Sequence, residues 1–333
     1  MKGTEVGRFK AAFDMVDWNR FRFWLQLSFF ILFVYGGYIG INVGNNLPTF
    51  SCGYNTEGRG GMCYLIPLQH QFAWKWEKLF SAAALTILTG FLTFGLWFIV
   101  FNKGWCGLAC PLGTIQDWIT ALRRRLGIRY GRYTLEQFRV LAQIKYVLLA
   151  LMLLIPLGIG AGWFSKDMGS PFCMICPGRM IIPTLTGKFD HWTVDFSTTA
   201  KMVMTSLGMV VAGLFFVGAF VKKRFFCFFC PMSALHYLIS KPALLTLKKD
   251  GSKCTRCGDC YRVCDMEIKE IADDVSNPRI MMDDCTLCLK CVAACPEPGA
   301  LKAKFATITF FESTEAGFIK RMHKGIHLDQ PKF

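Results

Sequence analysis

Eight cysteines near the C-terminus have the spacing of iron–sulfur ligands. One run reads C-x2-C-x2-C-x3-C, and a second run repeats it and ends in Cys295-Pro296. In this pattern three thiolates of a run bind one [4Fe–4S] cluster and the fourth binds the other cluster. We expect two such clusters, the first on Cys254, Cys257, Cys260 and Cys295, and the second on Cys285, Cys288, Cys291 and Cys264. Zinc is disfavoured, because zinc sites use two cysteine pairs with longer gaps.

One residue beside these runs bears on redox chemistry. Asp265 follows the fourth cysteine of the first run, where Pro296 follows that of the second. A negative charge beside a cluster stabilises its oxidised form. We therefore expect Asp265 to lower the potential of one cluster.

The other eight cysteines lie among long apolar stretches. The chain is 53% hydrophobic, 15% aromatic and 18% charged, whereas a globular chain carries about 25% charged residues. Four stretches are long enough to cross about 30 Å of hydrocarbon as helices. They are Phe23–Val43, Leu79–Val100, Tyr146–Trp163 and Met202–Val221. Pro156 predicts a kink in the third.

The basic charge of the chain follows these stretches. The net charge is +15, and residues 1–244 hold 24 Lys and Arg against 10 Asp and Glu, whereas residues 245–333 hold 14 against 13. Basic clusters beside apolar segments set membrane orientation, so nucleic acid is disfavoured as a partner. Their distribution predicts a multi-pass protein of the inner membrane with both termini in the cytoplasm.

On this topology the eight cysteines form two sets. The inner set follows the second and fourth spans, and the outer set follows the first and third. The inner set is Cys106, Cys110, Cys227 and Cys230; the outer set is Cys52, Cys63, Cys173 and Cys176. Two tandem hairpin repeats, at about 23–125 and 145–244, would bring each set together at its own face of the membrane, around an axis along the membrane normal.

Four thiolates suit a further iron–sulfur cluster or zinc, so each set is a candidate metal site. Other readings stay open. The outer cysteines suit disulfides, Cys52 with Cys63 most easily, since their compartment is oxidising. Buried free cysteine also acts as a small apolar residue.

Two segments near the inner set carry further expectations. Leu112 to Leu126 has apolar residues at helical spacing before Arg123–Arg125, which predicts an amphipathic helix at the membrane interface or an ordinary loop helix. None of the five histidines lies within a predicted span, so a bis-histidine haem is disfavoured. We expect His236 at the surface.

These observations predict a mainly α-helical fold. Residues 1–244 would form a four-helix transmembrane domain of two tandem hairpin repeats. Residues 245–333 would form an α+β ferredoxin domain for two [4Fe–4S] clusters, whose tail from Ala300 shows no readable motif. We find no catalytic acid–base pair, nucleophile motif, phosphate-binding loop or flavin signature. An electron-transfer subunit of a larger complex is therefore favoured over a stand-alone enzyme.

The membrane cysteine motifs resemble a known family. The segment from Gly104 to Gly113, Gly-Trp-Cys-Gly-Leu-Ala-Cys-Pro-Leu-Gly, is similar to the Cys-Gly-x2-Cys-Pro-x-Gly signature of NapH/NosR-type membrane polyferredoxins. Four spans, paired Cys-Pro motifs and the double-cluster domain resemble that family across most of the chain. Cys227 and Cys230 depart from the pattern, because two residues separate them where the family commonly has three.

The resemblance implies electron transfer between the quinone pool, or a periplasmic partner, and clusters on the cytoplasmic side. Other redox subunits and membrane lipid would be its partners, and quinone a further cofactor. A second hypothesis is a maturation or regulatory factor that supplies electrons for metal or cofactor reduction while another redox enzyme is assembled. A third is a structural anchor whose membrane cysteines form disulfides.

Overall fold

A computed structural model of the chain describes residues 16–41, 48–49, 62–73, 83–129, 131, 134–165, 170–280 and 284–323. The chain forms two compact units. Unit 1 contains residues 1–25, 98–108 and 239–333, and unit 2 contains residues 26–97 and 109–238. Unit 1 thus includes three segments that we assigned to the membrane domain, namely residues 1–25, 98–108 and 239–244. Cys52 lies outside the described residues.

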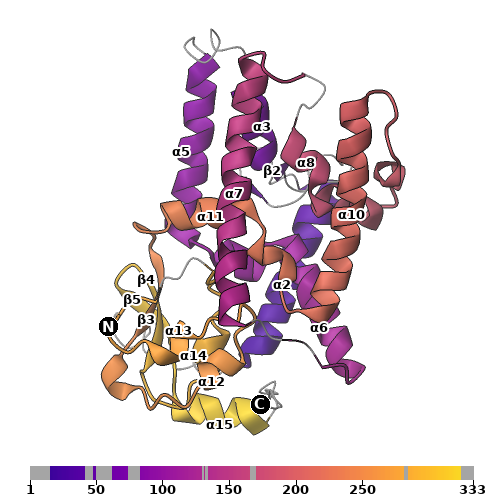
Figure 1. Cartoon of the computed structure of the whole chain (residues 1–333). Coiled ribbons are helices and arrows are strands. Elements are labelled where there is room, and N and C mark those ends of the chain that lie inside the picture. Colours follow the sequence, from indigo (N-terminus) through magenta and orange to yellow (C-terminus); the bar gives the residue numbers. More distant parts are fainter. Residues whose placement is uncertain are drawn as a thin grey trace. The chain divides into compact units, whose positions relative to one another are not determined.

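Long apolar helices run through the membrane part of the chain (Figure 1). They are α2 (Trp18–Tyr35), α5 (Ala83–Phe101), α7 (Leu135–Gly160) and α10 (Thr199–Val221). Among the described residues, three segments are long and apolar enough to cross a membrane, namely Trp18–Ile39, Glu136–Gly160 and Thr199–Val221. The described apolar part of α5, Leu88–Phe101, is shorter.

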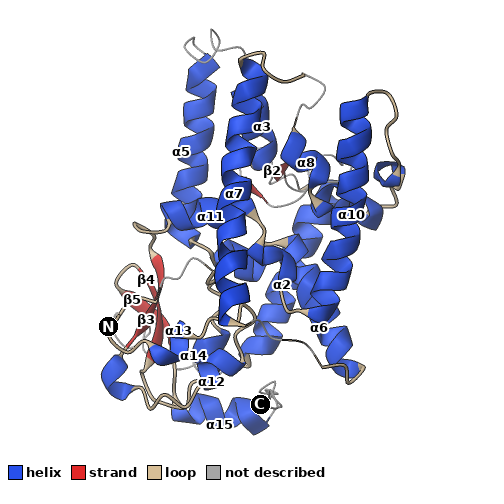
Figure 2. Cartoon of the chain, viewed as in Figure 1, coloured by secondary structure: helices blue, strands red, loops and turns tan. Residues whose placement is uncertain are grey.

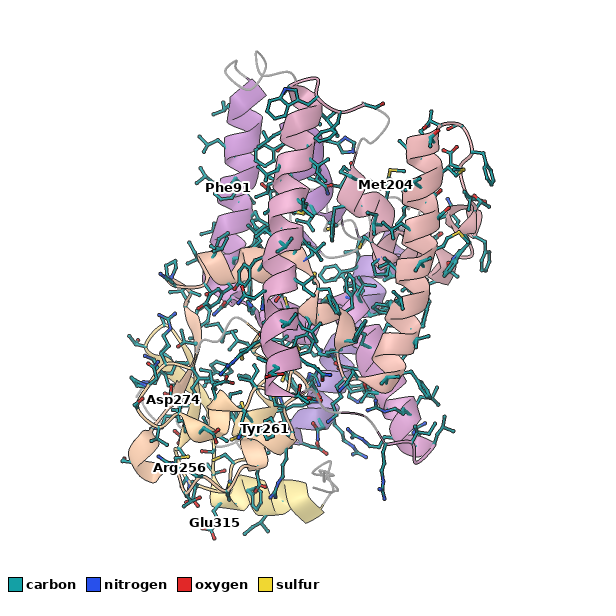
Figure 3. All side chains as sticks on the ribbon, viewed as in Figure 1. Phe91, Met204, Arg256, Tyr261, Asp274 and Glu315 are labelled. Atoms are coloured by element: carbon teal, nitrogen blue, oxygen red, sulfur yellow. The ribbon has the colours of Figure 1, made fainter. Side chains whose placement is uncertain are left out.

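The outward faces of these helices are apolar. Phe91 on α5 is 45% exposed, and exposed leucines and valines continue along α5, α7 and α10 (Figure 3). The exposed members include Leu88, Leu92, Leu96, Val147, Leu151, Leu154, Val203, Leu207, Val210 and Leu214. In water such surfaces would be costly, whereas hydrocarbon chains cover them without penalty. The chain is therefore a membrane protein.

Short helices fill unit 2 between the long ones. They are α3 (Leu65–Phe72), α6 (Pro111–Arg125), α8 (Pro171–Ile175), α9 (Pro177–Leu185) and α11 (Pro231–Ile239), with 3₁₀ turns η1 (Gly36–Ile39), η4 (Asp190–Trp192) and η5 (Phe225–Phe228). A parallel pair, β1 (Pro48–Thr49) and β2 (Met62–Cys63), precedes α3. Helix α3 packs beside α7, and α8 and α9 pack beside α10 (Figure 1).

Helix α6 confirms that a helix follows Cys110, but its faces differ from the expected ones, because Arg123 is 2% exposed. Its buried Leu112 and Ile115 pack with Phe30 of α2, Ile181 of α9 and Phe215 of α10, while Leu122 is 55% exposed. The apolar face of α6 thus contributes to the core of unit 2.

Unit 1 contains a small antiparallel sheet in the order β3-β4-β5 (Figure 2). The strands are β3 (Leu245–Lys249), β4 (Leu301–Phe305) and β5 (Ile308–Glu312). The helical elements are a π-helical turn η2 (Trp105–Ala109), the 3₁₀ turn η6 (Gly251–Lys253), α12 (Asp259–Arg262), α13 (Glu270–Asp273), α14 (Lys290–Ala294) and α15 (Glu315–His323). The expected C-terminal α+β domain is therefore present.

The start of α2 is part of unit 1 because it packs on the ferredoxin domain. The Trp18 ring stacks on Phe311 of β5 with centroids 4.8 Å apart. Asn102, which follows α5, donates from its side-chain amide to the Leu245 carbonyl at 2.9 Å. These contacts extend the ferredoxin unit beyond the boundary at residue 245.

Candidate metal centres

Two pockets of unit 1 are each lined by four cysteines. The first encloses about 360 Å³ of space and the second about 320 Å³, both partly open. The first is lined by Cys254, Cys257, Cys260 and Cys295, and the second by Cys264, Cys285, Cys288 and Cys291. These are the two sets that the spacing predicts, each taking its fourth cysteine from the other run.

Left-handed backbone positions curve both cysteine runs around their pockets. Arg256 and Leu287 occupy equivalent places, two residues after the first cysteine of each run, with φ of 57° and 49°. Gly258 and Leu289, two residues later, have φ of 82° and 58°. Non-glycine residues adopt this region at a cost of about 1–2 kcal/mol each. That cost is balanced when several thiols and amide groups converge on a common ligand.

The donor set of these pockets fits a thiolate-ligated cluster. Burial raises the pKa of the Cys260 thiol to about 12 and that of Cys285 to about 11, and it raises the pKa of Cys291 well above its usual value. Such thiols stay protonated at neutral pH unless metal ions stabilise the thiolates. Among the described residues, no three His, Cys, Asp or Glu side chains are placed to hold a single metal ion. The cysteines surround a space instead, as ligands of a polynuclear centre do.

A buried lysine lies beside the first pocket. Lys249 lines this pocket and is 5% exposed. Its ammonium group donates to the carbonyls of Ile271, Ala272 and Asp274 at 2.7, 3.1 and 2.6 Å. The Lys249 ammonium group thus binds carbonyls at the C-terminal end of α13 and places a positive charge close to Cys260. We did not identify Lys249 from the sequence, because nothing local distinguishes it from Lys248.

Asp265 lines the second pocket, but its charge is compensated. Its Oδ2 lies 2.6 Å from Lys290 Nζ and 3.7 Å from Arg22 Nη1. Asp265 is 3% exposed, so solvent screens these ion pairs little. We expected the Asp265 carboxylate to lower the potential of one cluster. The positive charges of Lys290 and Arg22 act in the opposite direction and reduce this effect.

The segment of Cys106 packs against the second cysteine run. A Cβ atom on Gly107 would lie 2.4 Å from the Thr286 carbonyl oxygen and 3.0 Å from the Cys288 nitrogen. Arg22 Nε donates to the Gly107 carbonyl at 3.3 Å, and Trp18 Nε1 donates to the Cys288 carbonyl at 2.8 Å. Cys106 therefore belongs to unit 1, whereas the other cysteines of its expected set belong to unit 2.

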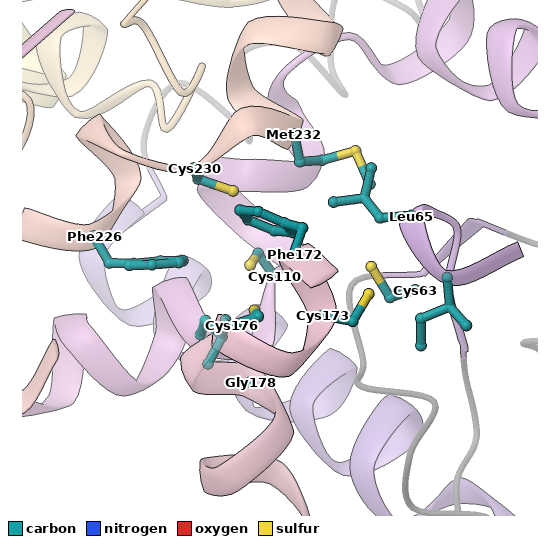
Figure 4. Close-up of a pocket in the computed structure, with 12 residues that line it drawn as sticks. Cys63, Leu65, Cys110, Phe172, Cys173, Cys176, Gly178, Phe226, Cys230 and Met232 are labelled. Carbon is teal, nitrogen blue, oxygen red and sulfur yellow. The ribbon is translucent and has the colours of Figure 1, made fainter. Parts of the chain in front are cut away.

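A third pocket lies within unit 2 and is partly open to its surroundings (Figure 4). The cysteines that line it are Cys63, Cys110, Cys173, Cys176 and Cys230. We expected the inner and outer sets at opposite faces, but the structure brings described members of both to one pocket. The reason is that α8 and α9 fold back beside α10. None of the cysteines that the structure describes forms a disulfide.

Proline fixes the position of cysteines at helix starts around this pocket. Cys110 and Cys176 are N-cap residues of α6 and α9, with φ/ψ of −66°/118° and −65°/130°. A residue before proline is held in extended conformation, and proline suits the first helical position. Cys230 likewise precedes Pro231, where α11 begins. Each Cys-Pro step therefore places a thiol beside the free amide groups of a helix start.

His236 departs from our expectation. We predicted a surface histidine, but it is 1% exposed on α11, with its ring centroid 6.3 Å from that of Phe94. The prediction was wrong because α11 packs inside unit 2.

Comparisons with known proteins point to the same chemistry. A family model described as a 4Fe-4S dicluster domain matches residues 246–296, and one described as a 4Fe-4S binding domain matches 83–129 and again 205–250. Each copy of the second match contains a pair of cysteines followed by proline. The chain therefore contains [4Fe–4S]-binding domains, and one of the two family models matches its membrane part twice.

Three curated relatives are similar over much of the chain. Ferredoxin-type protein NapH of Haemophilus influenzae is 25% identical over 84% of this chain and 88% of the relative. Ferredoxin-type protein NapH of Escherichia coli is 24% identical over 86% of this chain and 92% of the relative. Regulatory protein NosR of Pseudomonas aeruginosa is 26% identical over 65% of this chain but only 27% of NosR. No solved structure matches the chain.

Proposed function

We propose a function from the premise that the chain belongs to the NapH/NosR-type membrane polyferredoxins. It is a membrane-bound electron-transfer subunit that connects the quinone pool, or a periplasmic partner, with two clusters on the cytoplasmic side. The observation that carries this proposal is the pair of four-cysteine pockets in a chain with membrane-spanning helices. A [4Fe–4S] cluster accepts and gives one electron without breaking a bond in a substrate.

The chain's own residues supply binding, burial and charge. Cys254, Cys257, Cys260 and Cys295 would hold the first cluster, and Cys264, Cys285, Cys288 and Cys291 the second. Most of these thiols are buried or half-buried, whereas Cys257 is exposed. The edge of the first pocket at Cys257 is therefore where a redox partner could approach closely.

The setting of the subunit follows from charge and hydrophobicity. The Lys and Arg of residues 1–244 support an inner-membrane protein with cytoplasmic termini. We propose a complex with other redox subunits, with lipid around the apolar helix faces and quinone as a cofactor. Further metal centres would use the membrane cysteines, of which Cys106, Cys110, Cys227 and Cys230 are the inner candidates and Cys52, Cys63, Cys173 and Cys176 the outer ones.

A second candidate function is a maturation or regulatory role, which the similarity to Regulatory protein NosR favours. In that role the same clusters would deliver electrons only while a client enzyme is assembled. Stable co-purification with a catalytic subunit at constant stoichiometry would argue against it, and transient association would support it.

The proposal is tested by measuring iron, acid-labile sulfide and zinc per chain on anaerobically purified protein. We expect about eight irons and eight sulfides from unit 1, with any membrane centre adding to them. Cys260→Ser and Cys291→Ser should each lower both counts together. A chain with zinc in place of iron, or with iron unaffected by these substitutions, would contradict the proposal.

A further inference from the structure

Unit 2 contains a duplicated pair of segments that the tandem-hairpin repeat does not reveal. In each first segment, a cysteine is followed by leucine after two residues and by glutamine after six. These segments are Cys63–Gln69 and Cys110–Gln116. Each second segment reads Phe-Cys-x2-Cys-Pro, at Phe172–Pro177 and Phe226–Pro231.

In the first copy, Gln69 joins the two segments. Its side chain is 0% exposed. The Nε2 group donates to the Leu65 carbonyl at 3.0 Å and to Cys173 Sγ at 3.1 Å. Its Oε1 accepts from the Phe172 backbone N–H at 3.2 Å. The oxygen and the nitrogen of this side chain thus both contact one Phe-Cys step, and the nitrogen also bonds a carbonyl of its own helix.

In the second copy, Gln116 makes the same set of contacts. It is also 0% exposed. Its Nε2 donates to the Leu112 carbonyl at 3.2 Å and to Cys227 Sγ at 3.7 Å, and its Oε1 accepts from the Phe226 N–H at 2.9 Å. Each glutamine thus bonds the leucine carbonyl of its own segment, the first cysteine sulfur of the Phe-Cys-x2-Cys-Pro segment and the backbone N–H of the phenylalanine before it.

A repeated amide-to-sulfur hydrogen bond has a chemical meaning. A neutral thiol is a weak acceptor, so two buried glutamines gain little by orienting donors at thiols alone. A metal-bound thiolate carries negative charge and accepts such a bond well. Donors to ligand sulfurs are a main means by which proteins orient ligands and set cluster potentials.

The two copies open on the same pocket. Cys63, Cys173 and Cys176 come from the first copy, and Cys110 and Cys230 from the second. In the view of Figure 4 the sulfurs of Cys63 and Cys173 lie next to each other. The other lining residues, including Leu65, Phe172, Phe226 and Met232, are apolar. Soft thiolate ligands in such surroundings select iron–sulfur centres, Cu(I) or zinc, and the match to a 4Fe-4S binding domain around Cys110 and Cys230 favours the first of these.

We propose that the two copies form one iron–sulfur site, with thiolates from both copies around the shared pocket. Gln69 donates to Cys173, which lines this pocket, and Gln116 is the equivalent donor to Cys227, three residues before the lining Cys230. The site thus combines cysteines from the two sets that sequence alone separates. This inference rests on the proposed function, since it adds a centre to the same electron-transfer protein.

The first test compares Cys173→Ser with Cys230→Ser in the full-length chain, one substitution from each copy. We expect the wild type to hold more than the about eight irons of the ferredoxin pair, and each variant to lose the same excess of iron and sulfide. The electron paramagnetic resonance signals of the ferredoxin clusters should be unchanged. Thr205→Ser, a buried position of α10, is the control for a general packing effect.

The second test uses Gln69→Leu and Gln116→Leu, followed by potentiometric titration of the additional centre. Both variants should shift its potential to more negative values, because a donor to ligand sulfur stabilises the reduced form. About eight irons in the wild type, loss of the excess in only one cysteine variant, or no shift in either glutamine variant would overturn the inference. If the wild type holds about eight irons per chain, this inference fails but the proposed function stands. If the ferredoxin clusters are absent as well, the proposed function also fails.

Discussion

Lys290 Nζ lies 2.6 Å from Asp265 Oδ2 beside the second cysteine pocket, and Arg22 Nη1 approaches the same oxygen at 3.7 Å. The two cations come from distant parts of the chain, α14 and α2. Together they set the local charge beside a cluster that gains negative charge when it is reduced.

Changing this group should shift the potential of the second cluster in opposite directions. Lys290→Gln leaves more net negative charge and should lower the potential, whereas Asp265→Asn should raise it. Potentiometric titration followed by electron paramagnetic resonance measures both shifts. Lys269→Gln, which removes an exposed ion pair to Asp273, is the control and should have little effect. Shifts of the same sign in both variants would contradict the assignment.

Gly107 should tolerate no side chain. Its added Cβ would lie 2.4 Å from the Thr286 oxygen, and overpacking of this kind typically costs about 1–3 kcal/mol. Gly107→Ala should weaken or abolish the second cluster's signal and leave the first in place. Gly213→Ala, where the Cβ meets nothing within 4 Å, is the matched control. Equal signals in the two variants would show that the close approach does not matter.

Lys249 should matter for both stability and potential. Lys249→Met leaves three carbonyls without their donor, which costs about 1–3 kcal/mol for each group left unsatisfied. It also removes a positive charge near Cys260, so the first cluster's potential should fall. Thermal unfolding and redox titration measure the two effects. Lys248→Met, one position along β3 on its other face, should change neither the thermal stability nor the potential of the first cluster strongly. Equal effects of the two substitutions would contradict this prediction.

A buried ion pair should stabilise unit 2. Arg224 contacts Asp117 through Nε at 3.0 Å and Nη2 at 2.7 Å, and Gln26 donates to the same carboxylate at 2.7 Å. Arg224→Met would leave the Asp117 carboxylate, whose side chain is 14% exposed, without this cation, at a cost of at most about 3–5 kcal/mol. We expect a lower midpoint of thermal unfolding in detergent, partly restored by adding Asp117→Leu. Lys201→Met, in an exposed pair with Asp195, is the control, and an equal loss there would contradict this prediction.

The sequence predicted features that depend on local spacing. The cysteines of the C-terminal runs are two or three residues apart, and four apolar stretches indicated the long helices. The start of α7 was placed too late, at Tyr146 instead of Leu135, because Arg139 and Lys145 interrupt the apolar pattern. Thr134 and Gln137 form a capping box, and this signal was available in the sequence.

Features that depend on distant contacts could not be predicted. Strands β4 and β5 lie in the tail where we found no motif, and β4 is defined by pairing with β3, more than fifty residues earlier. The shared thiol pocket depends on α8 and α9 folding beside α10, which spacing does not encode. The repeated Cys-x-Leu-x3-Gln pattern of the two glutamines was present in the sequence. Their role as donors to Cys173 and Cys227 could be recognised only from the structure.

The most direct test of the account is redox titration of the full-length chain in its native membranes. Electron paramagnetic resonance should show two [4Fe–4S] clusters that are reduced reversibly, each by one electron, and that disappear together in a Cys260→Ser, Cys291→Ser double variant. A chain that holds iron but shows no reversible cluster reduction, or whose signals survive these substitutions, would contradict an electron-transfer function.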